Sequence, residues 1–167
     1  MIIDETKRLI IREIKKEEAC AASEYFKNVM GNTDFSKETV ESYIDTAYGF
    51  YGYGYWGLFE KETGNFVGLA GFREGSVPLE IGYYIAPEYR MMGYASEAVK
   101  SLLEFAEEDF LWVLSEKPAG VRVTANMLMT YLYNGKVLVY AKTERKNSAS
   151  VAVLRKNGFV ECEEFFR

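Results

Sequence analysis

The feature that most constrains the fold lies in residues 79–106, where an apolar run passes through a short turn into an amphipathic stretch. The run LEIGYYIA predicts a strand that stops at Pro87, because proline has no N–H group to donate to a sheet. In the stretch after residue 93 the apolar side chains recur at helical spacing: Ala95, Ala98, Val99, Leu102 and Ala106. Residues 90–95, which we call the cradle, join the predicted strand to the predicted helix.

The cradle has the features of an anion site. The first N–H groups of a helix have no acceptor within the helix, and the helix dipole favours negative charge there. Gly93 has no Cβ, so phosphates could approach the main chain closely, and Arg90 brings a planar guanidinium suited to phosphate oxygens. The pattern therefore predicts a pyrophosphate site. The GxxxxGK[ST] motif of a P-loop is absent, which argues against a nucleotide triphosphatase.

Composition narrows the chemistry. The chain contains no histidine, which excludes a Ser-His-Asp hydrolase, a Cys-His protease and a His-ligated metal site. We expect no metal, and a general base that is Glu, Asp, Lys, Tyr or Cys. The net charge of −5 argues against a nucleic-acid partner and is compatible with a cationic amine substrate, although solubility alone also explains it.

Length and hydropathy predict the class of protein. The 167 residues suffice for one core, and we expect a single domain over residues 1–167. No apolar run approaches the length of a membrane span, and the start MIIDE lacks a signal-peptide pattern, so we expect a cytoplasmic protein with no membrane partner. Cys20 and Cys162 are expected to be free thiols.

The rest of the sequence predicts an α+β order of elements. Strands are expected over residues 7–14, 55–61, 65–73, 79–86, 127–133, 136–142 and 159–166. Helices are expected over residues 15–31, from Ser36, after the cradle and over residues 147–156, with a break at 116–120. Residues 110–114 could extend the helix after the cradle. Asn134-Gly135 is a strong signal for a hairpin turn.

Residues 49–57 contain a GxGxxG pattern that we do not interpret as a dinucleotide site. That fingerprint follows a strand and opens a helix, whereas this segment follows a predicted helix and precedes a predicted strand. We expect a flexible aromatic loop. Its Tyr53 and Trp56, together with Phe26, either line the substrate entrance or belong to the core.

Four segments together resemble the GNAT superfamily of acyl-CoA-dependent N-acetyltransferases, and most closely its branch of Rim-type acetyltransferases that modify the N-termini of ribosomal proteins. The segments are RLIIREI, EKETGNFVGLAGFRE, LEIGYYIAPEYRMMGYASEAVKSLLEFA and NSASVAVLRKNGF. They cover most of the chain outside about residues 111–136. The resemblance implies a three-layer α+β fold with a mixed, mostly antiparallel central sheet flanked by helices. It also implies acetyl-CoA as the co-substrate and an amine as the acceptor.

The resemblance also implies roles for individual residues. The backbone of residues 91–95 would hold the pyrophosphate of coenzyme A, the strand end would pair with the pantetheine arm, and the late helix would touch that arm. The implied cofactor-binding residues are Ile85, Ala86, Arg90, Met91, Met92, Gly93, Tyr94, Ala95, Asn147 and Ser150. For the last two, other readings remain: Asn147 could only cap its helix, and Ser150 could be a surface residue.

Glu80 is the candidate general base, because several family members carry a catalytic glutamate on the strand that leads to the cradle. The other reading is that Glu80 faces solvent. Many members have a tyrosine four residues before the glycine of the Gly-Phe ending, as an acid for the leaving thiolate, and this chain has Leu154 there. The acceptor would be a protein N-terminus or a small-molecule amine. A non-catalytic acyl-CoA sensor or assembly subunit is the alternative function.

The chain departs from the family after the late helix. Two strands are usual there, and residues 159–167 have room for one. We expect residues 127–133 to pair antiparallel with residues 136–142 and to replace the missing strand, which makes an atypical hairpin before the late helix. Exchange of a strand with a second subunit, in a homodimer, is the other way to cover that edge.

Overall fold

A computed structural model describes residues 1–114 and 127–162 of the chain. Two compact units are distinguishable: Met1–Gly75 with Gly82–Ala98, and Ser76–Ile81 with Val99–Arg167. Strand β5 (Leu79–Ile85) and helix α3 (Tyr94–Asp109) contribute to both units. In the described residues, no helix combines the length and the apolar character needed to span a membrane.

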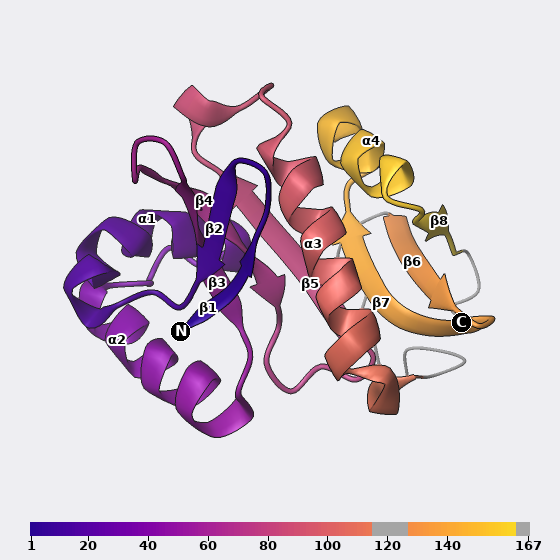
Figure 1. Cartoon of the computed structure of the whole chain (residues 1–167), viewed down its shortest axis with the longest axis horizontal. Coiled ribbons are helices and arrows are strands. Elements are labelled where there is room, and N and C mark those ends of the chain that lie inside the picture. The colour runs from indigo at the N-terminus through magenta and orange to yellow at the C-terminus, as the bar shows by residue number, and fades with distance from the viewer. Residues whose placement is uncertain (115–126, 163–167) are drawn as a thin grey trace. The chain divides into compact units, whose positions relative to one another are not determined.

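The first unit contains an antiparallel run of strands that are neighbours in sequence order (Figure 1). These strands are β1 (Ile2–Glu5), β2 (Leu9–Arg12), β3 (Tyr55–Glu60) and β4 (Phe66–Phe72). The last part of β5 follows β4, and the Ala86 N–H donates to the Val67 carbonyl at 2.9 Å. The strand predicted over residues 7–14 is shorter than expected, and β1, which the sequence analysis missed, pairs with it.

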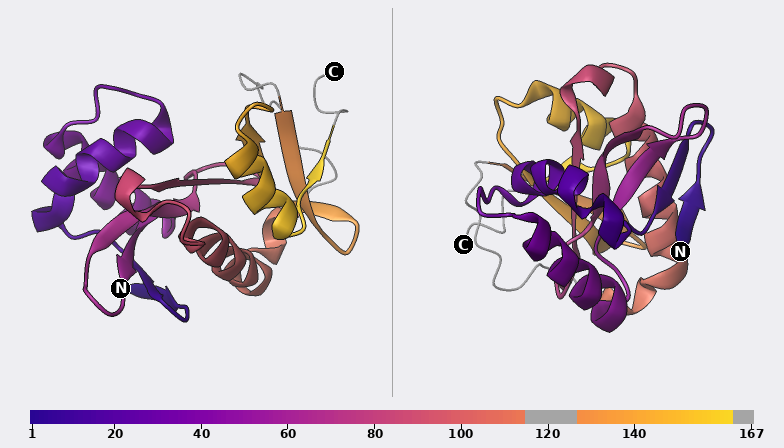
Figure 2. Two further views of the ribbon diagram at one scale, coloured as in Figure 1. Left: turned by 90° about the horizontal axis from the view of Figure 1, so that it is seen from above. Right: turned by 90° about the vertical axis from the view of Figure 1, so that its left-hand side faces the viewer.

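Helices α1 (Ala19–Met30) and α2 (Lys37–Thr46) pack against each other in the first unit (Figure 2). A 3-10 turn η1 (Lys16–Glu18) precedes α1, and a π-helical turn η2 (Ala47–Tyr51) follows α2. Gly31 ends α1 with a φ of +63°, which suits a residue without a Cβ. The Ser36 hydroxyl accepts from the Thr39 N–H at 3.2 Å. The predicted end signal at Gly31 and the predicted cap at Ser36 are thus confirmed, whereas α1 begins at Ala19 and not at the expected residue 15.

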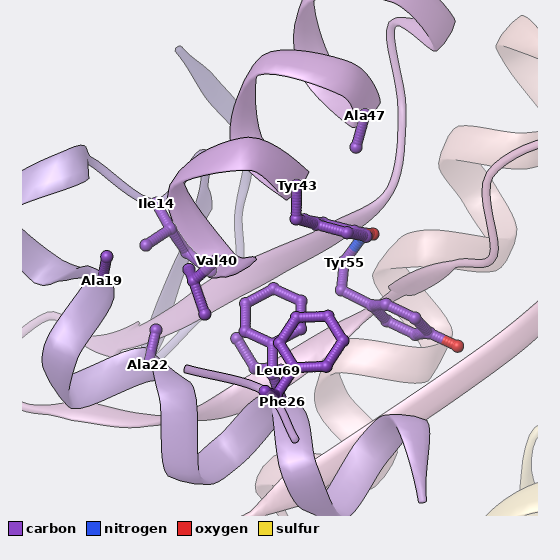
Figure 3. Close-up of a cluster of buried hydrophobic side chains, with 10 residues drawn as sticks. Ile14, Ala19, Ala22, Phe26, Val40, Tyr43, Ala47, Tyr55 and Leu69 are labelled. Atoms are coloured by element: carbon purple, nitrogen blue, oxygen red, sulfur yellow. The ribbon is translucent and has the colours of Figure 1, made fainter. Parts of the chain in front are cut away.

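An aromatic cluster forms the core between these helices and the sheet of the first unit (Figure 3). Phe26 stacks on Phe35 with ring centres 5.1 Å apart, and Tyr43 tilts against Phe26 at 4.8 Å. Of the candidate substrate residues, Phe26 belongs to this cluster, whereas Trp56 on β3 contacts Phe72 outside it; both are 0% exposed, and Tyr53 is 6% exposed. Fully burying such a side chain stabilises the fold by about 1.5–3 kcal/mol. These aromatic residues therefore have a packing role, and their contact with substrate stays a prediction.

The segment predicted as a flexible aromatic loop is largely regular. Its first residues belong to η2, and β3 begins at Tyr55. Gly54 fits between packed groups, because a Cβ there would lie 2.6 Å from the Tyr43 hydroxyl. The structure therefore limits the expected loop to residues 52–54, between η2 and β3.

In the second unit the strand order is β5-β7-β6-β8. The first residues of β5 pair parallel with β7 (Lys136–Thr143), and β6 (Met127–Tyr133) pairs antiparallel with both β7 and β8 (Val160–Glu161). The hairpin turn has φ values of +50° at Asn134 and +77° at Gly135, the left-handed pair that a two-residue turn requires. The predicted hairpin is confirmed, and β6 occupies the position between β7 and β8 (Figure 1).

Two helices complete the described part of the second unit. Helix α3 ends at Asp109, and a 3-10 turn η4 (Leu111–Val113) follows instead of the extension considered for residues 110–114. Helix α4 (Ser148–Lys156) ends before Gly158, whose φ is +88°. Leu154 is 1% exposed and belongs to the core. The predicted break at residues 116–120 and the end of the last predicted strand lie outside the described residues.

Candidate active site

The cradle has the backbone geometry that the sequence predicts. After β5, a 3-10 turn η3 (Pro87–Tyr89) leads into residues 90–95, and α3 begins at Tyr94. The first helical bond runs from the Glu97 N–H to the Gly93 carbonyl at 3.1 Å. Gly93 has a φ of +84°, and the exposed Met91 also has a positive φ, of +63°. The N–H groups of the first turn, beginning with Tyr94, therefore follow directly after a left-handed glycine.

Arg90, the predicted phosphate ligand, is anchored to the end of β5. Its Nε donates to the Ile85 carbonyl at 2.9 Å, and its guanidinium lies 5.4 Å from the centre of the Tyr84 ring. The side chain is exposed on the surface of the first unit. The Nε side of the Arg90 guanidinium is therefore bound to the end of β5, next to the cradle.

Main-chain groups at the predicted pantetheine contacts already have partners in the first unit. The Ala86 N–H donates to Val67, and the Ala86 carbonyl accepts from the Tyr89 N–H at 2.9 Å. The Ile85 carbonyl accepts from Arg90. A carbonyl oxygen has two lone pairs, so these bonds leave acceptor capacity at the strand end.

An arginine that the sequence analysis did not single out contacts the cradle. Arg8, just before β2, donates from Nη1 to the Met92 carbonyl at 2.7 Å. Its Nε and Nη2 contact one carboxylate oxygen of Glu97 at 2.8 and 2.7 Å, and its backbone N–H donates to the other at 2.8 Å. The Thr6 hydroxyl donates to Glu97 at 2.6 Å. The available signal was Arg8 as the first residue of RLIIREI. The alternation of apolar and polar residues in that segment did not distinguish it from an ordinary surface cation.

This cluster determines the ionisation of Glu97. Burial alone raises the pKa of a carboxyl, but the hydrogen bonds from Thr6 and Arg8 and the charge of Arg8 outweigh it and hold the pKa of Glu97 below its ordinary value. Glu97 is therefore a carboxylate at neutral pH. It ties the start of β2 to the first turn of α3.

Tyr94, the first residue of α3, is packed under the same arginine. The Arg8 guanidinium lies 4.5 Å from the centre of the Tyr94 ring, and Tyr94 is 4% exposed. The Tyr94 hydroxyl donates to Glu60, and this bond raises the pKa of Tyr94. Hydrogen bonds from Thr63 and Tyr94 lower the pKa of Glu60. The Tyr94 side chain is thus fixed in the protein, and its contribution to the cradle is its main chain.

Glu80, the predicted base, lies on β5 in the second unit, with 15% of its side chain exposed. The Tyr140 hydroxyl donates to one carboxylate oxygen at 3.0 Å, and Lys142 Nζ lies 3.4 Å from the other. Glu80 and Tyr140 are register partners on the parallel strands β5 and β7. The two partners orient the carboxylate, and the reading of Glu80 as a solvent-facing residue does not fit its exposure.

Asn147 and Ser150 lie at the start of α4 in the second unit. The Asn147 Oδ1 accepts from the Ser150 N–H at 3.2 Å, so the predicted capping bond is confirmed. Asn147 is exposed and Ser150 is half-buried. Their contact with pantetheine stays a prediction.

Comparison with known proteins identifies the class of this chain. Its mixed α+β sheet, with a strand that leads through a glycine turn into a helix, is the fold of an acetyltransferase. Residues 8–160 match the family model of the acetyltransferase (GNAT) domain. The chain therefore belongs to the GNAT acetyltransferase family, whose members use acetyl-CoA, and it is an N-acetyltransferase.

Solved structures share this fold at low sequence identity. An acetyltransferase of the GNAT family from Bacillus anthracis is 21% identical with a TM-score of 0.64, covering 95% of this chain and 82% of that one. A structure from Vibrio cholerae carries the provisional description of a ribosomal-protein-serine acetyltransferase. It is 20% identical with a TM-score of 0.59, and the match covers 95% of this chain and 84% of that one. RimL, a ribosomal L7/L12 alpha-N-protein acetyltransferase solved with coenzyme A, is 16% identical with a TM-score of 0.65, covering 95% and 83%.

Proposed function

We propose that this protein transfers the acetyl group of acetyl-CoA to a primary amine by direct attack, with Glu80 as the general base. The observation that carries the proposal is the cradle, where a left-handed Gly93 places the first turn of α3 directly after an exposed loop. Such a helix start binds phosphate groups through main-chain N–H donors and the helix dipole. The diphosphate of coenzyme A is the anion that the family uses.

The chain's own residues then have the following tasks. An acceptor amine is an ammonium ion at neutral pH, and Glu80 takes its proton directly or through one water. The neutral nitrogen forms a bond to the thioester carbonyl carbon, and the carbon–sulfur bond breaks. As the amide forms, the nitrogen gives up its second proton, and the sulfur, which leaves as the thiolate of coenzyme A, takes up a proton directly from the nitrogen or through water. A main-chain N–H group would stabilise the negative charge that develops on the thioester carbonyl oxygen during the attack.

The position of Glu80 supports its role. The carboxylate is mostly buried and is held at both oxygens, by Tyr140 and by Lys142. A base that is fixed in one orientation does not lose activity to rotation away from its substrate, because positioning is part of the rate enhancement.

The acceptor class is proposed from the relatives. Two solved neighbours are described as acetyltransferases of ribosomal proteins, which supports a protein N-terminus as the acceptor. A small-molecule amine, such as a polyamine, is the second candidate. The net charge of −5 is compatible with either cationic acceptor.

Thiol release from acetyl-CoA, measured across N-terminal peptides and small amines, tests the activity. In the variant Glu80→Gln, kcat should fall by about a hundredfold or more, because a general base contributes on that order, while the Kd for coenzyme A stays unchanged. Glu161→Gln is the matched control, since Glu161 is also a carboxylate in an ion pair of the second unit, with Arg145. Equal turnover of Glu80→Gln and wild type would refute the role of Glu80. Binding of coenzyme A without turnover on any amine would refute the proposed activity.

A further inference from the structure

We propose that Arg8 is a positioning residue of the acyl-donor site, which holds the cradle so that its N–H groups face the diphosphate of acetyl-CoA. The proposal rests on the proposed function and adds a residue to that site. Arg8 contacts residue 92, at the end of the loop, and residues 94 and 97, which are the first and fourth residues of α3 and belong to its first turn. One side chain therefore fixes both sides of the junction between loop and helix.

The bond to the Met92 carbonyl determines which way the cradle faces. The carbonyl of residue 92 and the N–H of residue 93 belong to one planar trans peptide, in which they point in opposite directions. Because the Met92 carbonyl is directed at Arg8, with a distance of 2.7 Å to Nη1, the Gly93 N–H is directed away from Arg8. The arginine thus turns an acceptor inward and a donor outward at the position where an anion would bind.

The cradle needs such a hold, because its backbone is not in a relaxed conformation. Met91 has a φ of +63°, which a residue with a side chain rarely adopts unless its surroundings impose it. The Met91 side chain is 98% exposed, so packing of that side chain does not impose it. The Arg8 bond to the carbonyl of the next residue, Met92, holds the main chain directly after Met91.

Gly93 is matched to Arg8. A Cβ on Gly93 would lie 3.2 Å from Arg8 Nη2, which is tighter than an ordinary contact. The absence of a side chain at position 93 therefore leaves room for the guanidinium as well as allowing the positive φ. The two residues, 85 positions apart in sequence, form one structural unit.

Arg8 contributes mainly by holding the cradle in one geometry, and not by attracting the diphosphate through its charge. Its charge is balanced by Glu97, which contacts the guanidinium at 2.7 and 2.8 Å. The planar fork of arginine contacts Glu97 and Met92 at once, and a lysine ammonium cannot reproduce that arrangement. The proposal therefore predicts that Arg8→Lys is impaired although the charge is kept.

The test uses the full chain with Arg8→Gln, Arg8→Lys and the matched control Arg12→Gln. Arg12 lies at the other end of β2, pairs with Glu18 through two bonds of 2.9 and 2.7 Å, and covers the Phe59 ring at 3.6 Å. Its loss removes a comparable ion pair and ring contact away from the cradle. The readouts are the Kd for coenzyme A by calorimetry, KM and kcat with acetyl-CoA, and the melting temperature.

Both Arg8 variants should raise the Kd and the KM for acetyl-CoA roughly tenfold or more, since a hydrogen bond to a charged group contributes about 1.5–3 kcal/mol. The value of kcat should change little, and Arg12→Gln should leave the Kd unchanged at a similar loss of melting temperature. S-acetylpantetheine, which ends before the phosphates, separates positioning from general damage, because its kcat/KM should be the same in Arg8→Gln and wild type.

Three results would overturn the proposal. The Kd could be unchanged in Arg8→Gln, the rate with S-acetylpantetheine could fall as much as the rate with acetyl-CoA, or Arg8→Lys could bind coenzyme A as tightly as wild type. A wild-type protein that does not bind coenzyme A would instead refute the proposed function, so the two failures are distinguishable.

Discussion

At the residue scale, the cradle depends on Gly93 for its left-handed φ of +84° and for the space beside Arg8. An L-residue in the left-handed region costs about 1–2 kcal/mol, so Gly93→Ala should lower the free energy of unfolding by that amount. It should also raise the Kd for coenzyme A, because the strained residue shifts the N–H groups that we propose to bind the diphosphate.

Gly64→Ala is the matched control for this prediction. Gly64 has a φ of +76° in the turn between β3 and β4, and a Cβ there would meet nothing within 4 Å. Urea unfolding should show similar losses for the two variants, and calorimetry should show weaker coenzyme A binding only for Gly93→Ala. Equal affinities in both variants would contradict the assignment of the cradle.

Glu97 predicts an acid dependence of stability. Its pKa is below the ordinary 4.5 in the folded chain, so on acidification the unfolded chain takes up the proton first. The stabilisation is complete above the unfolded pKa and is lost as the pH falls through the folded one. Urea unfolding from about pH 6 to about pH 3 should therefore show a smaller loss for Glu97→Gln than for wild type. Parallel losses would show that Glu97 does not contribute.

At the element scale, two helix caps allow a direct comparison. Ser36 caps α2 and Asn147 caps α4, each by accepting from the N–H three residues later. Replacing either by alanine should cost about 1 kcal/mol, measured by urea unfolding. If Asn147 also contacts pantetheine, as the resemblance implies, Asn147→Ala alone should raise the KM for acetyl-CoA. A KM equal to that of Ser36→Ala would restrict Asn147 to capping.

Local signals account for the elements that the sequence predicted well. Caps, left-handed glycines and the Asn134-Gly135 turn act within a few residues, so the helices, the hairpin and the cradle turn were predictable. β1 was missed because a four-residue strand carries little local signal, and its conformation depends on pairing with β2. The burial of Phe26 and Trp56 depends on packing between distant segments, which no local pattern encodes.

The same distinction holds for the site. The main-chain part of the cradle follows from a strand, a glycine and a helix that are contiguous in sequence. Arg8 was missed because its contacts with Met92 and Glu97 join residues more than 80 positions apart. The orientation of Arg90 toward Ile85 was also not predictable, since a side chain chooses among acceptors that only the folded chain presents.

At the scale of the whole molecule, each compact unit contains residues with a proposed task. The first contains the cradle with Arg8 and Arg90, and the second contains Glu80 with Tyr140 and Lys142. Membership in the GNAT family fixes the reaction class for the chain as a whole. Binding and chemistry should therefore be separable by mutation: variants of the cradle should change the KM for acetyl-CoA, and variants of Glu80 should change kcat.

Ligand binding should also be visible in the stability of the molecule. A ligand that binds only the folded state stabilises it by about 2.7 kcal/mol at a concentration 100 times its Kd. Coenzyme A should accordingly raise the melting temperature in proportion to the logarithm of its concentration, and pantetheine, which lacks the diphosphate, should do so far less. Equal shifts with both compounds would place the binding energy outside the cradle.

The most direct measurement of the central claim is a calorimetric titration of the folded protein with coenzyme A, carried out in parallel on wild type and Gly93→Ala. Saturable heat at one molecule per chain for wild type, with weaker binding in the variant, is the predicted result. A wild-type protein that unfolds cooperatively yet gives no heat with coenzyme A would contradict the claim that the start of α3 binds its diphosphate.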